Sequence, residues 1–185
     1  MIRFFDLLIS SIGLLVLLPI FAAVWLLGLI VDGSPLFTQT RLGLHAKPFK
    51  LYKFRTMRKD TPDVPSHKVS SGSITRWGHF LRRTKLDEIP QLINVVKGEM
   101  SLVGPRPCLP NQTELIALRQ GAGIFDQPPG ITGTAQILGL DMSNPGALVA
   151  EEARAKSALS LKVYFRTVFF TLFGAGMGDA AKRPK

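Results

Sequence analysis

Two adjacent carboxylates, Asp87 and Glu88, are the side chains of this sequence whose types and spacing are best suited to chemistry. Pro90 follows them, and proline is tolerated in a first helical turn, so we predict that a helix begins near Asp87 or Glu88. Lys97 and Gly98 form a typical helix stop. The positive end of the helix dipole favours an anion at Asp87, either a phosphate or the ionised carboxylate. An ionised carboxylate is a usable nucleophile, although an Asp-Glu pair in an arbitrary sequence is more often a helix cap and a first-turn acid.

Arg106 is the cation whose sequence context is most distinctive. It lies between Pro105 and Pro107, which hold the segment extended and lower the cost of ordering it. A guanidinium can bind two phosphate oxygens at once, and it can equally form a structural ion pair. From the residues alone, phosphate binding and a structural ion pair are equally favoured.

Four stretches, in order, resemble the motifs of the bacterial sugar transferases, the monotopic phosphoglycosyl transferases. They are Lys53 to Met57 (KFRTM), Leu86 to Leu92 (LDEIPQL), Gly104 to Pro107 (GPRP) and Pro129 to Gln136 (PGITGTAQ). The resemblance extends over nearly the whole chain. It implies an enzyme that transfers a sugar 1-phosphate from a UDP-sugar to polyprenol phosphate and releases UMP, as the first membrane step of glycoconjugate assembly.

The same resemblance implies roles for individual residues. Asp87 would attack the β-phosphorus and form a covalent phosphosugar intermediate, and Glu88 would hold Mg²⁺, which neutralises charge on the leaving group. Substrate contacts are expected from four side chains: Arg55, Arg82, Arg106 and Gln136. Thr134 stands where many relatives have an aromatic residue. The sugar specificity of this chain therefore cannot be inferred from that of any one relative.

The composition allows one compact catalytic unit and a membrane element. The chain has 185 residues, 46% of them hydrophobic, and its 23 Lys and Arg against 13 Asp and Glu give a formal charge of +10. That charge suits an anionic lipid surface, a nucleotide or a nucleic acid. One cysteine, Cys108, excludes an intrachain disulfide, and the three histidines lack a zinc-binding spacing. No dinucleotide-binding or P-loop motif is present in the sequence.

An apolar stretch from Leu7 to Val31, bounded by Asp6 and Asp32, must enter lipid. As one helix it would be about 37 Å long, since each residue adds about 1.5 Å, and a bilayer core is about 30 Å thick. Pro19 predicts a kink at residues 15–19. A kinked span and a re-entrant dip both remain open, and the resemblance favours the dip with both ends cytoplasmic. Relatives commonly carry serine before this proline, where this chain has Leu18.

Shorter patterns predict the elements around the site. Strands are expected at residues 36–41 and 49–57 as a basic hairpin, followed by a surface loop at residues 59–73 without catalytic residues. Residues 74–86 form a basic amphipathic segment that lies either at lipid headgroups or on the protein core. The helix after Asp87 is expected to be fixed in place by a buried apolar stripe, formed by Ile89, Leu92, Ile93 and Val96. Residues 161–173 are too short to span and should lie at the interface or pack on the body.

We therefore predict an α-rich α+β enzyme on the cytoplasmic face of a bacterial inner membrane. Residues 1–33 form the re-entrant helix and residues 34–185 the catalytic domain, with UDP-sugar, polyprenol phosphate and membrane lipid as partners, no nucleic acid, and homodimer formation left open. One alternative is a membrane-tethered nucleic-acid-binding protein, which the charge favours but which lacks a recognition motif. A second alternative is a non-catalytic scaffold, against which the joint presence of Asp87, Glu88 and Arg106 argues.

Overall fold

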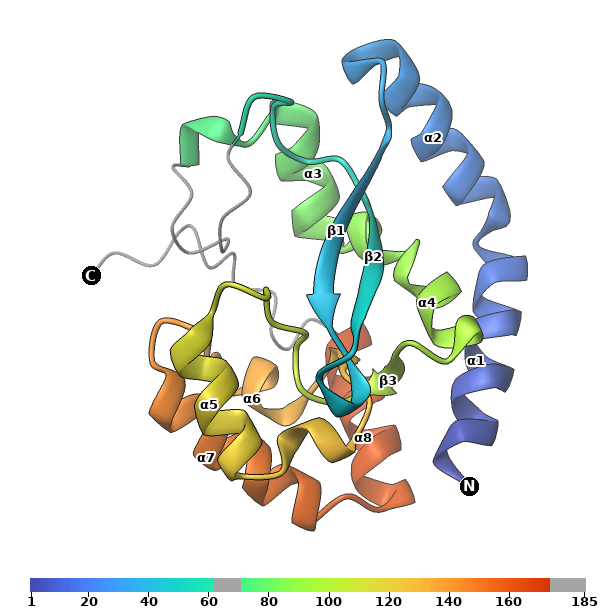
Figure 1. The fold of residues 1–185 in the computed structure, drawn as a ribbon. Coiled ribbons are helices and arrows are strands. Elements are labelled where there is room, and N and C mark those ends of the chain that lie inside the picture. Colours follow the sequence, from blue (N-terminus) through green and yellow to red (C-terminus); the bar gives the residue numbers. More distant parts are fainter. Residues whose placement is uncertain (62–70, 174–185) are drawn as a thin grey trace.

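The computed structural model describes residues 1–61 and 71–173, and these form an α-rich fold with two small two-stranded sheets (Figure 1), as the α+β prediction requires. The helices are α1 (Ile2–Val16), α2 (Leu18–Asp32), α3 (Arg76–Thr84), α4 (Gln91–Lys97), α5 (Thr113–Gly121), α6 (Thr134–Ile137), α7 (Pro145–Ser157) and α8 (Leu161–Leu172). The strands are β1 (Leu36–Leu42), β2 (Pro48–Phe54), β3 (Ser101–Val103) and β4 (Gly130–Thr132). Residues 62–70 of the predicted 59–73 loop lie outside the described residues.

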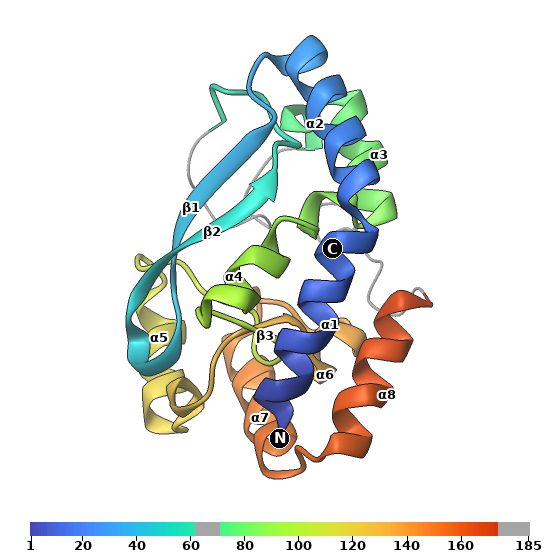
Figure 2. The ribbon, with the colours of Figure 1, turned by 90° about the vertical axis from the view of Figure 1, so that its right-hand side faces the viewer.

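The apolar N-terminal stretch is broken where the proline predicts it. α1 and α2 meet at Leu17 with a bend of 60°, and Pro19 lies in the first turn of α2, where its missing N–H leaves no hydrogen bond unmade. Among the described residues, no single helix is long and apolar enough to cross a membrane, whereas the bent pair together meets that test by length and composition. In both views the pair runs along one side of the body (Figures 1 and 2).

α1 is fixed to the body by polar contacts at its N-terminal half. The Arg3 guanidinium donates to the carbonyl oxygens of Val95 and Val96 at 2.7 and 3.2 Å, where α4 ends. Asp6 is 2% exposed, and its Oδ1 accepts from the Leu102 amide at 2.9 Å and from the Tyr164 hydroxyl at 2.8 Å. A buried carboxylate with several donors is satisfied without solvent, so this end of α1 is bound to β3 and α8.

α2 and α3 cover the other end of the hairpin. Val24 of α2 packs with Phe54 of β2 and Leu81 of α3 in one buried cluster. α3 approaches the chain beyond β2 so closely that a Cβ on Gly78 would lie 1.9 Å from the Thr56 carbonyl oxygen, which only glycine permits. The predicted amphipathic segment is thus helical and packs on the core through Leu81, while Phe80 on its other side is 42% exposed.

The hairpin has the predicted strand pairing with a shorter second strand. β1 and β2 are antiparallel, with Gln39 opposite Leu51, and β2 ends at Phe54 rather than at Met57. The free edge of β2 is covered by Asn94 of α4, which donates to the Lys50 carbonyl at 2.7 Å and accepts from the Tyr52 amide at 3.1 Å. A side-chain amide thereby replaces the missing neighbouring strand.

That arrangement corrects the predicted buried stripe of α4. Ile93 and Val96 are 36% and 38% exposed, and the buried positions are instead Gln91, Asn94 and Val95. The helix turns a polar face inward because Asn94 must reach the backbone of β2. Ile89 is 8% exposed and Leu92 packs against a core cluster, so the apolar pattern is confirmed at these two positions and wrong at Ile93 and Val96.

β3 and β4 form a parallel pair, and β3 leads directly into residues 104–107, which carry Arg106 and are called the arginine segment below. Ser101 pairs with Gly130 and Val103 with Thr132. A Cβ on Gly130 would lie 2.1 Å from the Gly104 amide nitrogen, so the two backbones touch where β3 ends. The close approach that this glycine allows is therefore to the protein's own chain.

The remaining helices pack beneath the sheets. The fully buried Arg119 of α5 pairs with Glu152 of α7 through two hydrogen bonds, of 2.9 and 2.5 Å. α8 packs on the body through Tyr164 and Thr167. Packing on the body was one of the two positions expected for residues 161–173, the other being the membrane interface. Phe169 of α8 is 56% exposed and does not contribute to that packing.

Candidate active site

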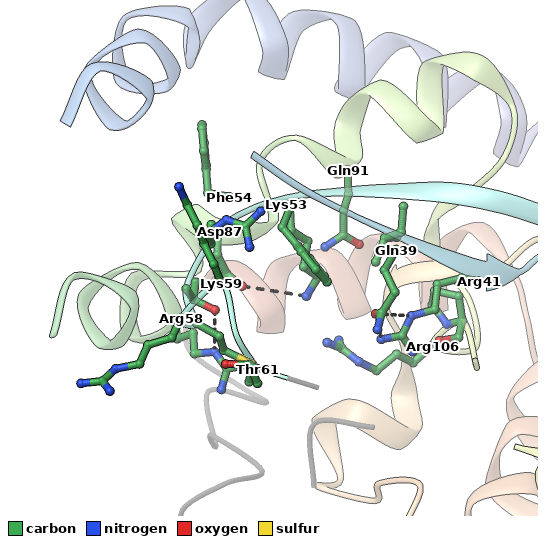
Figure 3. Close-up of a pocket in the computed structure, with 17 residues that line it drawn as sticks. Gln39, Arg41, Lys53, Phe54, Arg58, Lys59, Thr61, Asp87, Gln91 and Arg106 are labelled. Carbon is green, nitrogen blue, oxygen red and sulfur yellow. Dashed lines mark hydrogen bonds and ion pairs between the residues drawn. The ribbon is translucent and has the colours of Figure 1, made fainter. Parts of the chain in front are cut away.

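The candidate site is a cavity of about 120 Å³ between the hairpin, the turn before α4 and the arginine segment (Figure 3). It is lined by cations from separate parts of the chain and by one carboxylate. The charged lining residues are Arg41, Lys53, Arg55, Arg58, Lys59, Arg82, Asp87 and Arg106. A concave site with many cations around one acid is suited to a substrate with several negative charges.

Asp87 lies at the wall of this cavity, and Glu88 lies directly behind it. Asp87 is buried and Glu88 is partly buried, with side chains 8% and 12% exposed. The Lys53 Nζ of β2 lies 2.9 Å from the Glu88 Oε1 and 3.9 Å from the Asp87 Oδ2, and Figure 3 shows the second of these contacts across the cavity. Lys53 therefore joins both carboxylates, and the sequence analysis did not assign it a role.

The two carboxyl groups differ in their electrostatic surroundings. Burial raises the pKa of Asp87, and the neighbouring Glu88 charge adds to this effect against the opposing cations. Burial alone would also raise the pKa of Glu88, but Lys53, Arg106 and Lys85 outweigh it and hold this pKa well below its usual range. Glu88 is thus ionised, whereas the ionisation of Asp87 depends on the cations that face it.

Arg106 is positioned by contacts on both sides of its segment. Its Nη2 donates to the Glu88 Oε1 at 3.3 Å, and its side chain is 38% exposed at the cavity. Arg41 of β1 donates through Nη1 to the Pro107 carbonyl at 3.0 Å and through Nε to the buried Gln39 amide oxygen at 2.9 Å. The β1 strand thus fixes the backbone that carries Arg106.

The structure brings most of the predicted site residues together. Arg55 and Arg82 line the same cavity as Asp87 and Arg106. The Arg82 Nε donates to the Thr56 Oγ1 at 3.2 Å, and Arg55 donates to the Ser34 carbonyl at 3.1 Å, which connects the hairpin to the end of α2. Gln136 is not among the lining residues; it lies on α6, where it donates to the Ile131 carbonyl at 3.2 Å.

The expected helix at Asp87 is also different in detail. Asp87 lies in a 3-10 turn, Leu86–Glu88, and α4 begins at Gln91 with Pro90 as its cap. The amides of Glu88 and Ile89 donate to the carbonyls of Lys85 and Leu86, so they are not directed at an anion. The predicted end of α4 is confirmed, since Gly98 follows Lys97 in the left-handed region.

Several lining residues were not identified from the sequence. Lys53, Gln39, Arg41, Gln91, Lys59 and Thr61 all face the cavity. Lys53 and Gln91 belong to the motifs that carry the family resemblance, which was the available signal. Lys59 and Thr61 fall in the segment expected to lack site residues, and no local pattern distinguishes them from a polar loop.

The two carboxylates fit a metal ion that is shared with a substrate. Within residues 1–61 and 71–173, no group of three or more His, Cys, Asp or Glu side chains could enclose a metal. Mg²⁺, however, commonly binds to one or two carboxylates and completes its shell with phosphate oxygens and water. Asp87 and Glu88 are two adjacent carboxylates at the cavity, a donor set of the kind that a shared ion uses, and an ion bound there would compete with Lys53 and Arg106 for the Glu88 carboxylate.

Comparison with known proteins gives one family and a consistent set of relatives. The model of a family described as "Bacterial sugar transferase" matches residues 1–173. An uncharacterized sugar transferase, EpsL of Bacillus subtilis, is 47% identical over 108 residues, or 58% of this chain and 53% of the relative.

Two further relatives carry more specific names. A UDP-glucose:undecaprenyl-phosphate glucose-1-phosphate transferase of Caulobacter vibrioides is 45% identical over 112 residues, covering 58% of this chain and 42% of the relative. A protein of the same name in Escherichia coli is 36% identical over 187 residues, covering 95% of this chain and 40% of the relative. The chain thus spans about half the length, or less, of these three relatives.

Proposed function

This chain belongs to the bacterial sugar transferase family, and on that basis we propose that it transfers a sugar 1-phosphate from a UDP-sugar to polyprenyl phosphate and releases UMP. Relatives named as UDP-glucose:undecaprenyl-phosphate glucose-1-phosphate transferases support this reaction. The single observation that carries it is the buried Asp87 facing a cavity lined by Lys53, Arg82 and Arg106.

Asp87 is the proposed nucleophile. One of its carboxylate oxygens forms a bond to the β-phosphorus, while the bond from this phosphorus to the bridging oxygen breaks and UMP leaves with that oxygen. A phosphate oxygen of the polyprenyl phosphate then attacks the same phosphorus, and the Asp87 carboxylate is released. Two displacements keep the two anionic substrates from having to occupy the cavity together.

The cations around the cavity have separate tasks in this scheme. Lys53 lies between the carboxylates and lowers their repulsion toward an incoming diphosphate. Arg106 and Arg82, which line the same cavity as Asp87, bind phosphoryl oxygens, and a guanidinium can do so with two parallel hydrogen bonds. Arg55 and Gln136 are proposed to support the site indirectly, since both side chains donate hydrogen bonds to backbone carbonyls.

Glu88 and Asp87 are the residues that would hold Mg²⁺. When bound, this ion would neutralise charge that develops on the leaving phosphate. Excess chelator should then abolish turnover and added Mg²⁺ restore it. Glu88→Gln should require a much higher Mg²⁺ concentration, because the substitution removes one negative charge from the ligand pair. Full activity in excess chelator would refute the metal role.

We also propose that the α1–α2 pair enters one leaflet and returns, with the body on the cytoplasmic face. Support comes from contacts at both ends of the pair: α1 binds β3 and α4 through Asp6 and Arg3, and α2 packs on β2 and α3 through Val24. A helix pair with its two halves against one body does not leave room for a full bilayer between its ends. This geometry would bring a soluble nucleotide and a lipid acceptor to the same cavity.

The function is tested by direct assay of the purified chain. A panel of UDP-sugars is supplied with polyprenyl phosphate and Mg²⁺, and UMP release is measured. We expect turnover with at least one UDP-sugar and formation of a lipid-linked diphosphosugar. Absence of UMP release with every sugar in the panel would reject the proposed function.

A further inference from the structure

Gln91 is a buried amide on the cavity wall whose nitrogen has no hydrogen-bond partner. The residue is 3% exposed, and within the described part of the chain no acceptor lies within hydrogen-bonding distance of its Nε2. Leaving a buried donor unpaired costs about 1–3 kcal/mol, so such a group in a folded protein calls for an explanation. Gln91 also lines the cavity that contains Asp87.

The backbone places Gln91 on the same wall as Asp87. The chain runs from the 3-10 turn at residues 86–88 through Ile89 and Pro90, both in right-handed helical conformation, into α4. Residues four apart in such a path project from one face. Figure 3 shows the Gln91 amide directed toward the side chains of Lys53 and Arg106. Three donor groups therefore converge beside one carboxylate.

We propose that the Gln91 amide donates a hydrogen bond to an oxygen of the substrate diphosphate, on the phosphoryl group that Asp87 attacks. This inference rests on the proposed function and adds a binding residue to it. Lys53 and Arg106 supply charge, whereas a neutral amide supplies a directed donor that fixes the orientation of the phosphoryl group. A ligand oxygen would satisfy the Nε2, which no acceptor in residues 1–61 and 71–173 reaches.

A neighbouring residue of similar chemistry has a different role and serves as a control. Asn94, one turn further along α4, is fully buried, and its amide bonds to the Lys50 carbonyl, the Tyr52 amide and the Glu99 carboxylate. These bonds are structural, and they are complete without a ligand. The two amides should therefore respond in opposite ways to apolar replacement.

The experiment compares Gln91→Met and Asn94→Leu with the wild-type chain. For each we measure the melting temperature, the dissociation constant for UDP by calorimetry, and kcat/KM for UMP release. Gln91→Met removes an unpaired buried donor at similar volume, so its melting temperature should equal or exceed that of the wild type. Its affinity for UDP should fall by about tenfold and its kcat/KM by about 10²-fold. Asn94→Leu should lower the melting temperature clearly.

Gln91→Glu provides a second variant of nearly the same shape. A carboxylate at this position would repel the diphosphate, so UDP affinity should fall further than in Gln91→Met. Two results would overturn the assignment: unchanged UDP affinity together with unchanged kcat/KM in Gln91→Met, or a loss of melting temperature as large as that of Asn94→Leu. A wild-type chain that binds UDP but releases no UMP would reject the proposed function, while the binding comparison would still decide the role of Gln91.

Discussion

Lys53 shows how much of the site depends on a residue that neither its type nor its spacing identifies. It contacts both acids, and burial lowers its pKa while Glu88 and Asp87 oppose that change. The carboxylate pair and Arg106 could be selected from the sequence because their neighbours are unusual. For Lys53 the only signal was its place in a motif of the family resemblance, since a lysine on a basic hairpin is usually solvated and the packing of β2 on the turn before α4 directs this one inward.

Replacing Lys53 with methionine should affect both the fold and the reaction. The variant leaves the two buried carboxylates without their nearest cation, and breaking a buried ion pair costs roughly 3 kcal/mol. Its melting temperature should fall, and UMP release should fall by about 10²-fold. Lys50→Met on the same strand is the control: Lys50 is exposed and its ammonium donates to the Thr40 hydroxyl, away from the carboxylates, so both measurements should stay near wild type. Equal behaviour of the two variants would remove Lys53 from the site.

Asp87 is the proposed nucleophile of the covalent step, so its substitution should separate chemistry from folding. Asp87→Asn keeps the side-chain shape and should retain the melting temperature within a few degrees, while turnover falls by several orders of magnitude. Intact-protein mass spectrometry of the wild type with UDP-sugar alone should show a phosphosugar adduct, which the variant lacks. Turnover at the wild-type rate in Asp87→Asn would end the nucleophile assignment.

At the scale of elements, the sequence predicted best where local backbone chemistry decides. The break near Pro19 and the stop at Gly98 follow from the conformations that proline and glycine allow. The hairpin was predicted from its strand patterns, although its turn places His45 and Ala46 rather than a glycine in the left-handed region. The inward face of α4 was predicted only in part: Ile89 and Leu92 pack inward, whereas Ile93 and Val96 are exposed because hydrogen bonds from Asn94 to β2 set the orientation of the helix. The cavity itself was not predictable, since it forms between segments that are distant in sequence.

The close packing of α3 gives a sharp test at this scale. Gly78→Ala would place a methyl group 1.9 Å from the Thr56 carbonyl oxygen, so α3 must move away from the hairpin and carry Arg82 with it. Overpacking of this kind costs about 1–3 kcal/mol, and turnover should fall as well. Gly121→Ala, on α5, meets no atom within 4 Å and should be neutral or slightly stabilising because alanine favours helix. Circular dichroism melts and UMP release measure both effects, and an unperturbed Gly78→Ala would contradict this packing.

At the scale of the whole molecule, the outward surface of the bent pair is apolar while its inner surface is anchored. Phe4, Leu15 and Ile30 are 64%, 72% and 81% exposed, whereas Asp6 and Val24 are buried against the body. The sequence could indicate that residues 7–31 enter lipid, but it could not distinguish a span from a dip. That distinction depends on Asp6, whose buried partners lie more than 90 residues away in the chain.

The orientation of the N-terminus decides between these topologies. If the pair dips into one leaflet, a single cysteine placed before Met1 should be protected from a membrane-impermeant thiol reagent in intact cells and labelled after the cells are opened. Met1 is 90% exposed, so protection would not come from burial in the protein. The background carries Cys108→Ser, and Glu114→Cys on the exposed surface of α5 reports the side of the body.

Asp6 adds a reason to expect the dip. Its contacts with Leu102 and Tyr164 hold the start of α1 on the same body that follows α2, and a crossing helix would have to break them and leave a charge without donors. Restoring helix continuity with Pro19→Leu removes the bend, while Asp6→Leu removes the anchor. We expect the double variant to shift the N-terminal cysteine toward outside labelling, because the straightened helix is then long enough to cross. Outside labelling of the wild-type chain would show a true span and reject the one-sided arrangement.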